Sequence, residues 1–107
     1  MELGVGSREK IMSEGFRFQR LEIWKRASQL SKILFNLAAE LEKKRLYRFA
    51  EQLRAATLSI TNNIAEGSGS HSKMEFATFL NYSRRSVYEV ANILLIMHEN
   101  GYIVINN

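Results

Sequence analysis

The amino-acid sequence predicts an all-α fold, an antiparallel up-and-down bundle of three long helices. Apolar residues recur at steps of three and four along most of the chain, the spacing that puts side chains on one face of a helix. The 107 residues contain no proline, so no helix interior is broken by one. A Gly/Ser segment at residues 67–72 separates two of the periodic stretches, and the short connections force neighbouring helices to run antiparallel.

The first helix is expected over residues 19–44 and carries two apolar stripes. The predicted core stripe consists of Ile23, Ala27, Leu30, Leu34, Leu37 and Leu41. A second stripe, away from this face, consists of Leu21, Trp24, Ser28, Phe35 and Ala39. Because aromatic and small residues gathered on an outer face are typical of a protein interface, we expect a homo-oligomer that buries the Trp24 and Phe35 side between subunits. The alternative is that Trp24 only fills the edge of the bundle.

The second helix is expected over residues 46–66. Its core stripe is predicted as Leu46, Phe49, Leu53, Ala56, Ile60 and Ile64. Tyr47, Leu58 and Ala65 fall on the opposite face, which adds Tyr47 and Leu58 to the predicted subunit interface. Gly67 and Gly69 are expected to end this helix because glycine adopts the left-handed conformation without a steric cost.

The third helix is expected over residues 73–100. Ser72 and Glu75 have the spacing of a capping box that starts a helix, and Gly101 is expected to end it. The predicted core stripe is Phe76, Leu80, Ser83, Val87, Val90, Ala91 and Leu94. Residues 1–14 are polar and contain glycine, so we expect a poorly ordered extension followed by a single domain over residues 15–107.

Composition narrows the function classes. The chain has no cysteine, which excludes disulfides and thiolate metal sites, and we expect no metal ion and no cofactor. The longest apolar run, residues 90–97, is interrupted by Asn92, so neither a signal peptide nor a membrane span is expected. These features suit a cytoplasmic protein that does not contact a membrane.

The positive charge is concentrated in one part of the chain. Residues 17–54 contain ten Lys or Arg and four Glu, whereas the net charge of the whole chain is only +4. A localised basic surface favours polyanions, with nucleic acid the commonest in a cytoplasm, although it can also serve only to keep a protein soluble. The candidate nucleic-acid-binding residues are Lys25, Lys32, Lys43, Lys44, Arg45 and Arg48.

These residues predict contacts to phosphate, because no base-reading element such as a helix-turn-helix is present. Tyr47 lies within the basic cluster and either stacks on a base or packs in the core or an interface. The plain alternative for Lys43, Lys44 and Arg45 is that they complement the carbonyl end of the first helix.

The loop at residues 67–72 is a second and weaker candidate for anion binding. It leads into a helix N-terminus, where free amides hold phosphate, and its candidate residues are Gly69, Ser70, His71 and Ser72. It lacks the lysine of a P-loop, and the alternative, which the sequence favours, is a simple interhelical turn. Arg54, Asn63 and Glu66 form at most a structural network, since one carboxylate without a matched acid or nucleophile makes no hydrolase. We therefore predict no enzyme.

The sequence resembles the four-helix-bundle family of proteins encoded in intervening sequences of bacterial large-subunit ribosomal RNA genes. The resemblance spans about residues 18–102 and is most specific in AEQLRAATLSITNNIAEGSGSHSKMEF, with Trp24 and Ala27 fitting the first helix. It implies a relation to the accessory protein of diversity-generating retroelements, a basic pentameric barrel that engages nucleic acid and a reverse transcriptase. No catalytic residue set comes with the resemblance.

The resemblance also implies a fourth helix after Gly101, whereas this sequence ends at Asn107. We therefore expect that helix to be truncated or absent and a groove to run along the bundle, covered through association. Two functions stay open. One is a non-enzymatic, homo-oligomeric protein, a pentamer by resemblance, that binds the backbone of RNA or an RNA-DNA intermediate. The other is a protein-interaction scaffold or accessory subunit, for example of a reverse transcriptase.

Overall fold

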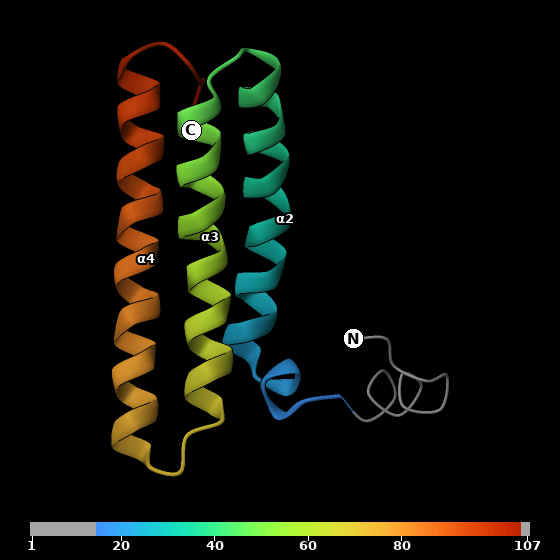
Figure 1. Ribbon diagram of the computed structural model, residues 1–107, viewed down its shortest axis with the longest axis vertical. Helices are drawn as coiled ribbons and strands as arrows, with labels where there is room; N and C mark the ends of the chain where they lie inside the picture. The colour runs from blue at the N-terminus through green and yellow to red at the C-terminus, as the bar shows by residue number, and fades with distance from the viewer. Residues whose placement is uncertain (1–14, 106–107) are drawn as a thin grey trace.

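The computed structural model describes residues 15–105, and the regular structure in this range is entirely helical. A short 3-10 helix, η1 (Arg17–Arg20), leads into the three long helices α2 (Glu22–Lys43), α3 (Tyr47–Ser68) and α4 (Lys73–Glu99). Neighbouring helices run in opposite directions, with α3 between α2 and α4 (Figure 1). The predicted all-α, up-and-down bundle of three long helices is confirmed. The predicted extension, residues 1–14, lies outside the described residues.

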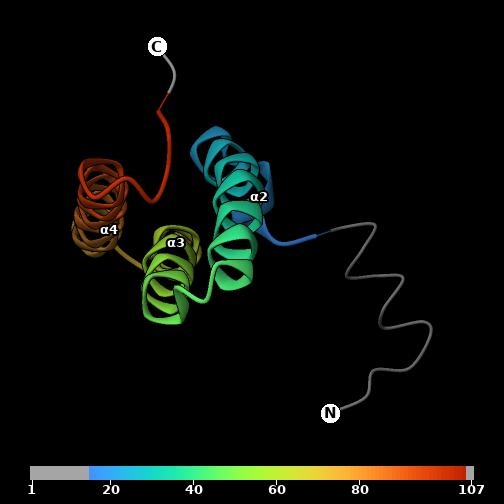
Figure 2. The same ribbon diagram turned by 90° about the horizontal axis from the view of Figure 1, so that it is seen from above.

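The three helices form an open arc and not a closed triangle. Both α2 and α4 pack against α3, but within residues 15–105 no Cα atom of α2 lies within 8 Å of one in α4. Seen from above, α3 sits at the bend of the arc and the outer helices stand apart (Figure 2). The inner face of this arc is therefore lined by three helices and closed by none.

The core lies where α3 meets its two neighbours. Eleven apolar residues are buried there: Leu34, Ala38, Leu41, Ala50, Leu53, Ala56, Ile60, Ile64, Val90, Ile93 and Met97. Five of them come from α3, because only this helix is covered on two sides. Small residues such as Ala38, Ala50 and Ala56 let the helix axes approach closely. The predicted burial of Leu53, Ala56, Ile60 and Ile64 is confirmed.

The predicted core stripes of the two outer helices are only partly correct. Ile23 and Leu30 of α2 and Val87 of α4 are 50%, 40% and 43% exposed. They lie on the inner face of the arc, where burial would require α2 and α4 to touch. Ile93 and Met97, which lie outside the predicted stripe of α4, are buried together with Val90, which belongs to it.

The predicted role of the two loop glycines is only partly correct: Gly69 follows the last helical residue, but Gly67 does not end the helix and neither glycine is left-handed. The helix α3 continues through Gly67 to Ser68, and its C-cap Gly69 has φ −85°, which is not left-handed. Gly67 is buried against α4, and a Cβ atom there would lie 2.7 Å from Cβ of Phe79 and 2.8 Å from Cδ1 of Phe76. Gly67 therefore permits close packing of α3 on α4. The predicted cap at Ser72 is present: its hydroxyl accepts a hydrogen bond from the amide of residue 75 at 3.0 Å.

The C-terminal tail folds back on its own protomer. Gly101 has φ 76° and completes a Schellman motif, in which the Tyr102 amide donates to the carbonyl oxygen of Met97 at 2.9 Å. The Tyr102 ring then packs against Phe49, with 5.6 Å between centroids, and Ile103 packs against the core. The tail thus covers one end of the arc.

Candidate nucleic-acid interface and the groove beside it

The basic cluster predicted between the first two long helices forms a tight turn, which we call the basic turn: Lys43, Lys44, Arg45 and Arg48. The turn joins α2 to α3 at the end of the molecule that also carries the tail (Figure 1). Arg45 donates its amide to the carbonyl oxygen of Glu42 at 2.8 Å, and the Leu46 amide donates to that of Leu41 at 2.9 Å. These two bonds define a Schellman motif like the one at Gly101.

Arg45 occupies the position in this motif that glycine usually takes. Its φ is 63°, and it is the only non-glycine residue with a positive φ in residues 15–105. A side chain in the left-handed region costs roughly 1 to 2 kcal/mol. The basic turn therefore keeps an arginine where glycine would be more stable, and backbone strain of this kind is often found at functional sites.

The side chains of the basic turn are exposed and only partly neutralised. Lys43 pairs with Glu40 at 3.1 Å on the surface of α2, and the Lys44 ammonium donates to the Tyr102 carbonyl oxygen at 3.1 Å. Arg45 and Arg48 make no ion pair or side-chain hydrogen bond with any residue in the described range. Their guanidinium groups are thus available to an external anion.

Two further predicted cations extend the basic surface along α2. Lys25 and Lys32 are exposed, and spacings of 7 and 11 residues put them on the same side of the helix as Lys43. At 1.5 Å per residue the three span about 27 Å. Tyr47 is 58% exposed beside the turn. Lys25, Lys32 and Lys43 thus share one side of α2, and the other predicted cations lie in the turn at its end.

The predicted subunit interface divides into two kinds of residue. Leu21 and Trp24 are half-buried and pack against the protomer's own core, and Trp24 also contacts the Phe18 ring, with 5.3 Å between centroids. Phe35 and Leu58 are exposed, as is Tyr47. The exposed residues remain candidates for contact with another copy.

The weaker anion site is a small hollow at the start of α4. Ser70, His71 and Ser72 line it, as predicted for the loop, and are joined by Lys73 and by Arg17 from η1. The Arg17 guanidinium donates a hydrogen bond to the Ser68 carbonyl oxygen at 2.9 Å, although the two residues are 51 positions apart. Sequence reasoning missed Arg17 because no local pattern signals this contact. Gly69 caps α3 beside the hollow.

The polar residues inside α3 make a small network that differs from the predicted one. Asn63 donates to the carbonyl and hydroxyl oxygens of Ser59 at 2.8 and 3.1 Å, and Ser86 donates to that same hydroxyl at 2.8 Å. Arg54 pairs with a carboxylate of α2, and Glu66 is exposed. The network joins α3 to α4 without forming an acid or nucleophile pair.

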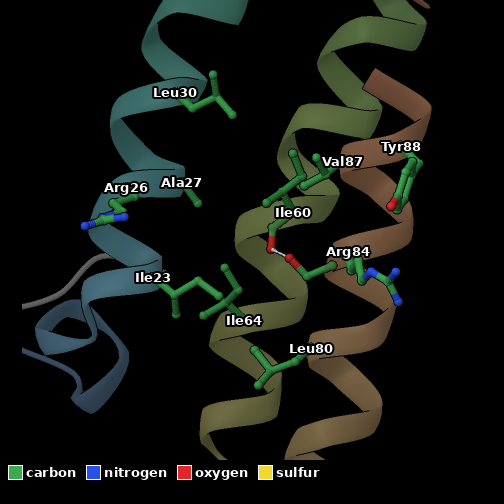
Figure 3. A pocket seen from close by; sticks show the side chains of 11 residues that line it. Ile23, Arg26, Ala27, Leu30, Ile60, Ile64, Leu80, Arg84, Val87 and Tyr88 are labelled. Atoms are coloured by element: carbon green, nitrogen blue, oxygen red, sulfur yellow. Dashed lines mark hydrogen bonds between the residues drawn. The ribbon is translucent and has the colours of Figure 1, made fainter. Parts of the chain in front are cut away.

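The inner face of the arc holds an apolar groove of about 590 Å³. Its floor is α3 and its walls are α2 and α4 (Figure 3). The groove is lined by Ile23, Arg26, Ala27, Leu30, Ile60, Ile64, Leu80, Ser83, Arg84, Val87 and Tyr88. The groove that sequence reasoning expected along the bundle is therefore present.

Within residues 15–105 no three His, Cys, Asp or Glu side chains are grouped so that they could hold a metal ion. No helix in the same range is both long and apolar enough to cross a membrane.

The family comparison covers the three long helices and the basic turn. The model of the family described as 23S rRNA-intervening sequence protein matches residues 19–107. The chain belongs to this family. Comparisons with curated proteins and with solved structures give no match. The 23S rRNA-intervening sequence proteins are the family that the sequence resembles, and the fold is the all-α bundle expected from the sequence.

Proposed function

We propose that this member of the 23S rRNA-intervening sequence protein family is a non-enzymatic protein that binds the phosphate backbone of RNA through the basic turn. The observation that carries the proposal is Arg45, held in a left-handed conformation in which a glycine would be more stable. Its exposed guanidinium, with the ammonium groups of Lys43 and Lys44 and the guanidinium of Arg48, offers positive charge to phosphate oxygens. The family description, 23S rRNA-intervening sequence protein, is compatible with RNA as the polyanion.

The basic turn suits backbone contact and not the reading of bases. It is a convex corner between two helices, and its exposed side chains are cations with one aromatic ring, Tyr47. Such a surface binds phosphate regardless of sequence, and its affinity falls as salt rises because counterions are released on binding. Lys25 and Lys32 extend the contact along α2, over a length comparable with several nucleotides.

Assembly of copies is part of the proposal. Phe35 and Leu58 expose large apolar side chains on adjacent helices, 36% and 49% of each. Burying them between copies would stabilise an assembly and repeat the basic turn around it. Several weak contacts to one RNA then act together and raise the overall affinity.

The test is a salt titration of RNA binding. A fluorescently labelled 20-nucleotide single-stranded RNA is bound at several NaCl concentrations, and the slope of log K against log salt is measured. The triple variant Lys43→Ala, Lys44→Ala and Arg48→Ala should bind more weakly and show a slope smaller by about 2, because each lost phosphate contact removes about 0.7 for a single strand.

The control removes charge elsewhere. Arg84→Ala with Arg85→Ala takes two exposed cations from α4, outside both candidate anion sites. This variant should keep the slope of the parent protein. No RNA affinity at low salt, or a loss in this control as large as in the triple variant, would contradict binding at the basic turn. A monomeric mass at micromolar concentration would separately contradict the assembly.

A further inference from the structure

We propose that a polar hollow between α3 and α4 binds an unpaired guanine base of RNA, an inference that rests on the proposed RNA binding and adds a base-reading site to it. The hollow measures about 430 Å³, within the range of small-molecule sites. Every side chain that lines it carries a hydrogen-bonding group: Ser59, Asn63, Tyr82, Arg85, Ser86 and Glu89. The hollow and the apolar groove share no lining residue, so covering the groove leaves the hollow open.

The floor of the hollow is a hydrogen-bond network with unused capacity. Ser86 is buried, and Ser59 and Asn63 are half-buried. The Ser59 hydroxyl oxygen accepts hydrogen bonds from Asn63 and Ser86, at 3.1 and 2.8 Å. Within residues 15–105 the Ser59 hydroxyl hydrogen and the Asn63 side-chain oxygen take part in no hydrogen bond. The floor therefore offers one free donor beside one free acceptor, which the edge of a nucleobase can match.

Glu89 selects the base. Neither Glu89 nor Arg85, one turn earlier on α4, makes an ion pair or a side-chain hydrogen bond in the described range. A carboxylate only accepts hydrogen bonds, and it can accept two from adjacent donors. Of the four RNA bases, only guanine presents two neighbouring N–H donors on its Watson–Crick edge, with an acceptor oxygen beside them that the Ser59 hydroxyl can serve. Adenine and cytosine offer one amino group there, and uracil offers one N–H between two oxygens.

Tyr82 provides a ring on which the base can stack. Its side chain is 45% exposed, and its ring makes an edge-to-face contact with Phe79, with 6.0 Å between centroids. Exposed aromatic rings of this kind stack on the bases of single-stranded RNA. The charges of Arg85 and Glu89 cancel, so the hollow suits a neutral base better than a phosphate.

The hollow lies on the side of α3 that leads to the basic turn. Arg48 and Ser59 are 11 residues apart, just over three helical turns, so they lie on one side of α3 at a distance of about 17 Å. The helix α4, which supplies the rest of the hollow, runs alongside α3 (Figure 1). An RNA strand whose phosphates contact the basic turn can therefore place a base in the hollow a few nucleotides away.

The first experiment uses nucleosides, which carry no phosphate, and the full chain labelled with ¹⁵N. Amide chemical shifts are followed as guanosine, adenosine, cytidine, uridine or inosine is added to millimolar concentration. Guanosine should bind at least tenfold more tightly than adenosine, cytidine or uridine. Inosine lacks the amino group of guanosine and should bind at least fivefold more weakly than guanosine, because it offers the carboxylate one donor fewer.

Variants locate the binding. Glu89→Gln replaces one acceptor oxygen with a donor, so guanosine and inosine should bind this variant equally. Tyr82→Ala should weaken guanosine at least fivefold because it removes the stacking ring. The control, Tyr88→Ala, removes another exposed tyrosine of α4 that lies outside the hollow, and guanosine binding should stay within twofold.

RNA oligonucleotides connect the hollow to the basic turn. A 20-nucleotide RNA of uridines with one central guanosine should bind the parent protein at least fivefold more tightly than an RNA of uridines alone. Glu89→Gln should remove this difference. The slope of log K against log salt should be the same for both RNAs, because a neutral base adds no phosphate contact.

Four results would overturn the inference. They are no guanosine binding, a preference for guanosine over inosine that survives Glu89→Gln, equal losses in Tyr82→Ala and Tyr88→Ala, and a fall in oligomeric mass caused by Tyr82→Ala without ligand. The last result would show that a second copy fills the hollow. Guanosine binding retained in the basic-turn triple variant would support the hollow whatever that variant does to RNA binding, so failure of one proposal is distinguishable from failure of the other.

Discussion

Replacement of Gly67 by alanine tests how closely α3 and α4 pack. A Cβ atom at this position would lie 2.7 Å from Cβ of Phe79 and 2.8 Å from Cδ1 of Phe76. Contacts between non-bonded carbon atoms are most favourable at about 3.5 to 4.0 Å, so both contacts are too short by about 1 Å. The Phe79 atom is fixed to the backbone of α4 and cannot rotate away. The two helices must therefore separate, or α4 must shift.

The magnitude follows from two opposing terms. Overpacking of this kind typically costs about 1 to 3 kcal/mol, and the upper half of that range applies because backbone must move. Alanine is favoured over glycine inside a helix by about 1 kcal/mol. We expect Gly67→Ala to lower the free energy of unfolding by about 1 to 2 kcal/mol, and the melting temperature by roughly 4 to 16 °C for a domain of this size.

The assay is thermal and urea unfolding followed by circular dichroism at 222 nm, at one fixed protein concentration because assembly would also change the apparent stability. Gly69→Ala is the matched control. Its added Cβ would meet only the Glu66 carbonyl oxygen at 3.5 Å, an ordinary contact, so its stability should be unchanged or raised by up to about 1 kcal/mol. A Gly67→Ala protein as stable as the parent would refute the close packing of α3 on α4 at this point.

Three further substitutions test the core and the exposed faces. Leu53→Ala should lower the free energy of unfolding by about 2 to 5 kcal/mol in urea titrations, because Leu53 is fully buried; a loss under 1 kcal/mol would argue against its place in the core. Leu58→Ala should change protomer stability by less than about 0.5 kcal/mol but lower the oligomeric mass measured by light scattering, and an unchanged mass would remove Leu58 from the interface. Ser83→Ala should cost about 1 kcal/mol, since its hydroxyl donates to the Ile60 carbonyl oxygen at 2.8 Å; equal stability in urea would show that this bond contributes nothing.

Helix positions followed from the sequence because periodicity and capping are local. The expected start of the last helix at Lys73 is correct, and the other predicted boundaries differ by one to three residues. The capping serine at Ser72 and the glycine ending at Gly101 are both present. Each of these features depends on residues within one or two turns of one another, and a single sequence shows those relations directly.

The neighbour of each helix face could not be predicted in the same way. Periodicity places Leu30 and Val87 on apolar stripes and so predicts them in the core, but it does not show that α2 and α4 stay apart. It places Trp24 on an outer stripe, but no local pattern shows that the Phe18 ring packs against it. Glycine in a Gly/Ser segment predicts a helix end at Gly67, because close packing between two helices leaves no local pattern in the sequence.

The candidate site was predicted as a set of cations but not as a strained turn. Lys43, Lys44, Arg45 and Arg48 stand out in the sequence by charge alone. The positive φ of Arg45 depends on how the chain must reverse between α2 and α3, and arginine gives no signal for it. The strained backbone at Arg45 thus gives a reason, beyond charge, to assign a function to this turn and not to the other basic residues.

Arg45→Gly tests the central claim most directly, with stability and RNA affinity measured on the same protein. Glycine relieves the left-handed strain, so the free energy of unfolding should rise by about 1 kcal/mol. The loss of one phosphate contact should weaken binding of the 20-nucleotide RNA and reduce the slope of log K against log salt by about 0.7. A protein that becomes more stable while its RNA affinity and salt slope stay unchanged would contradict phosphate binding by Arg45.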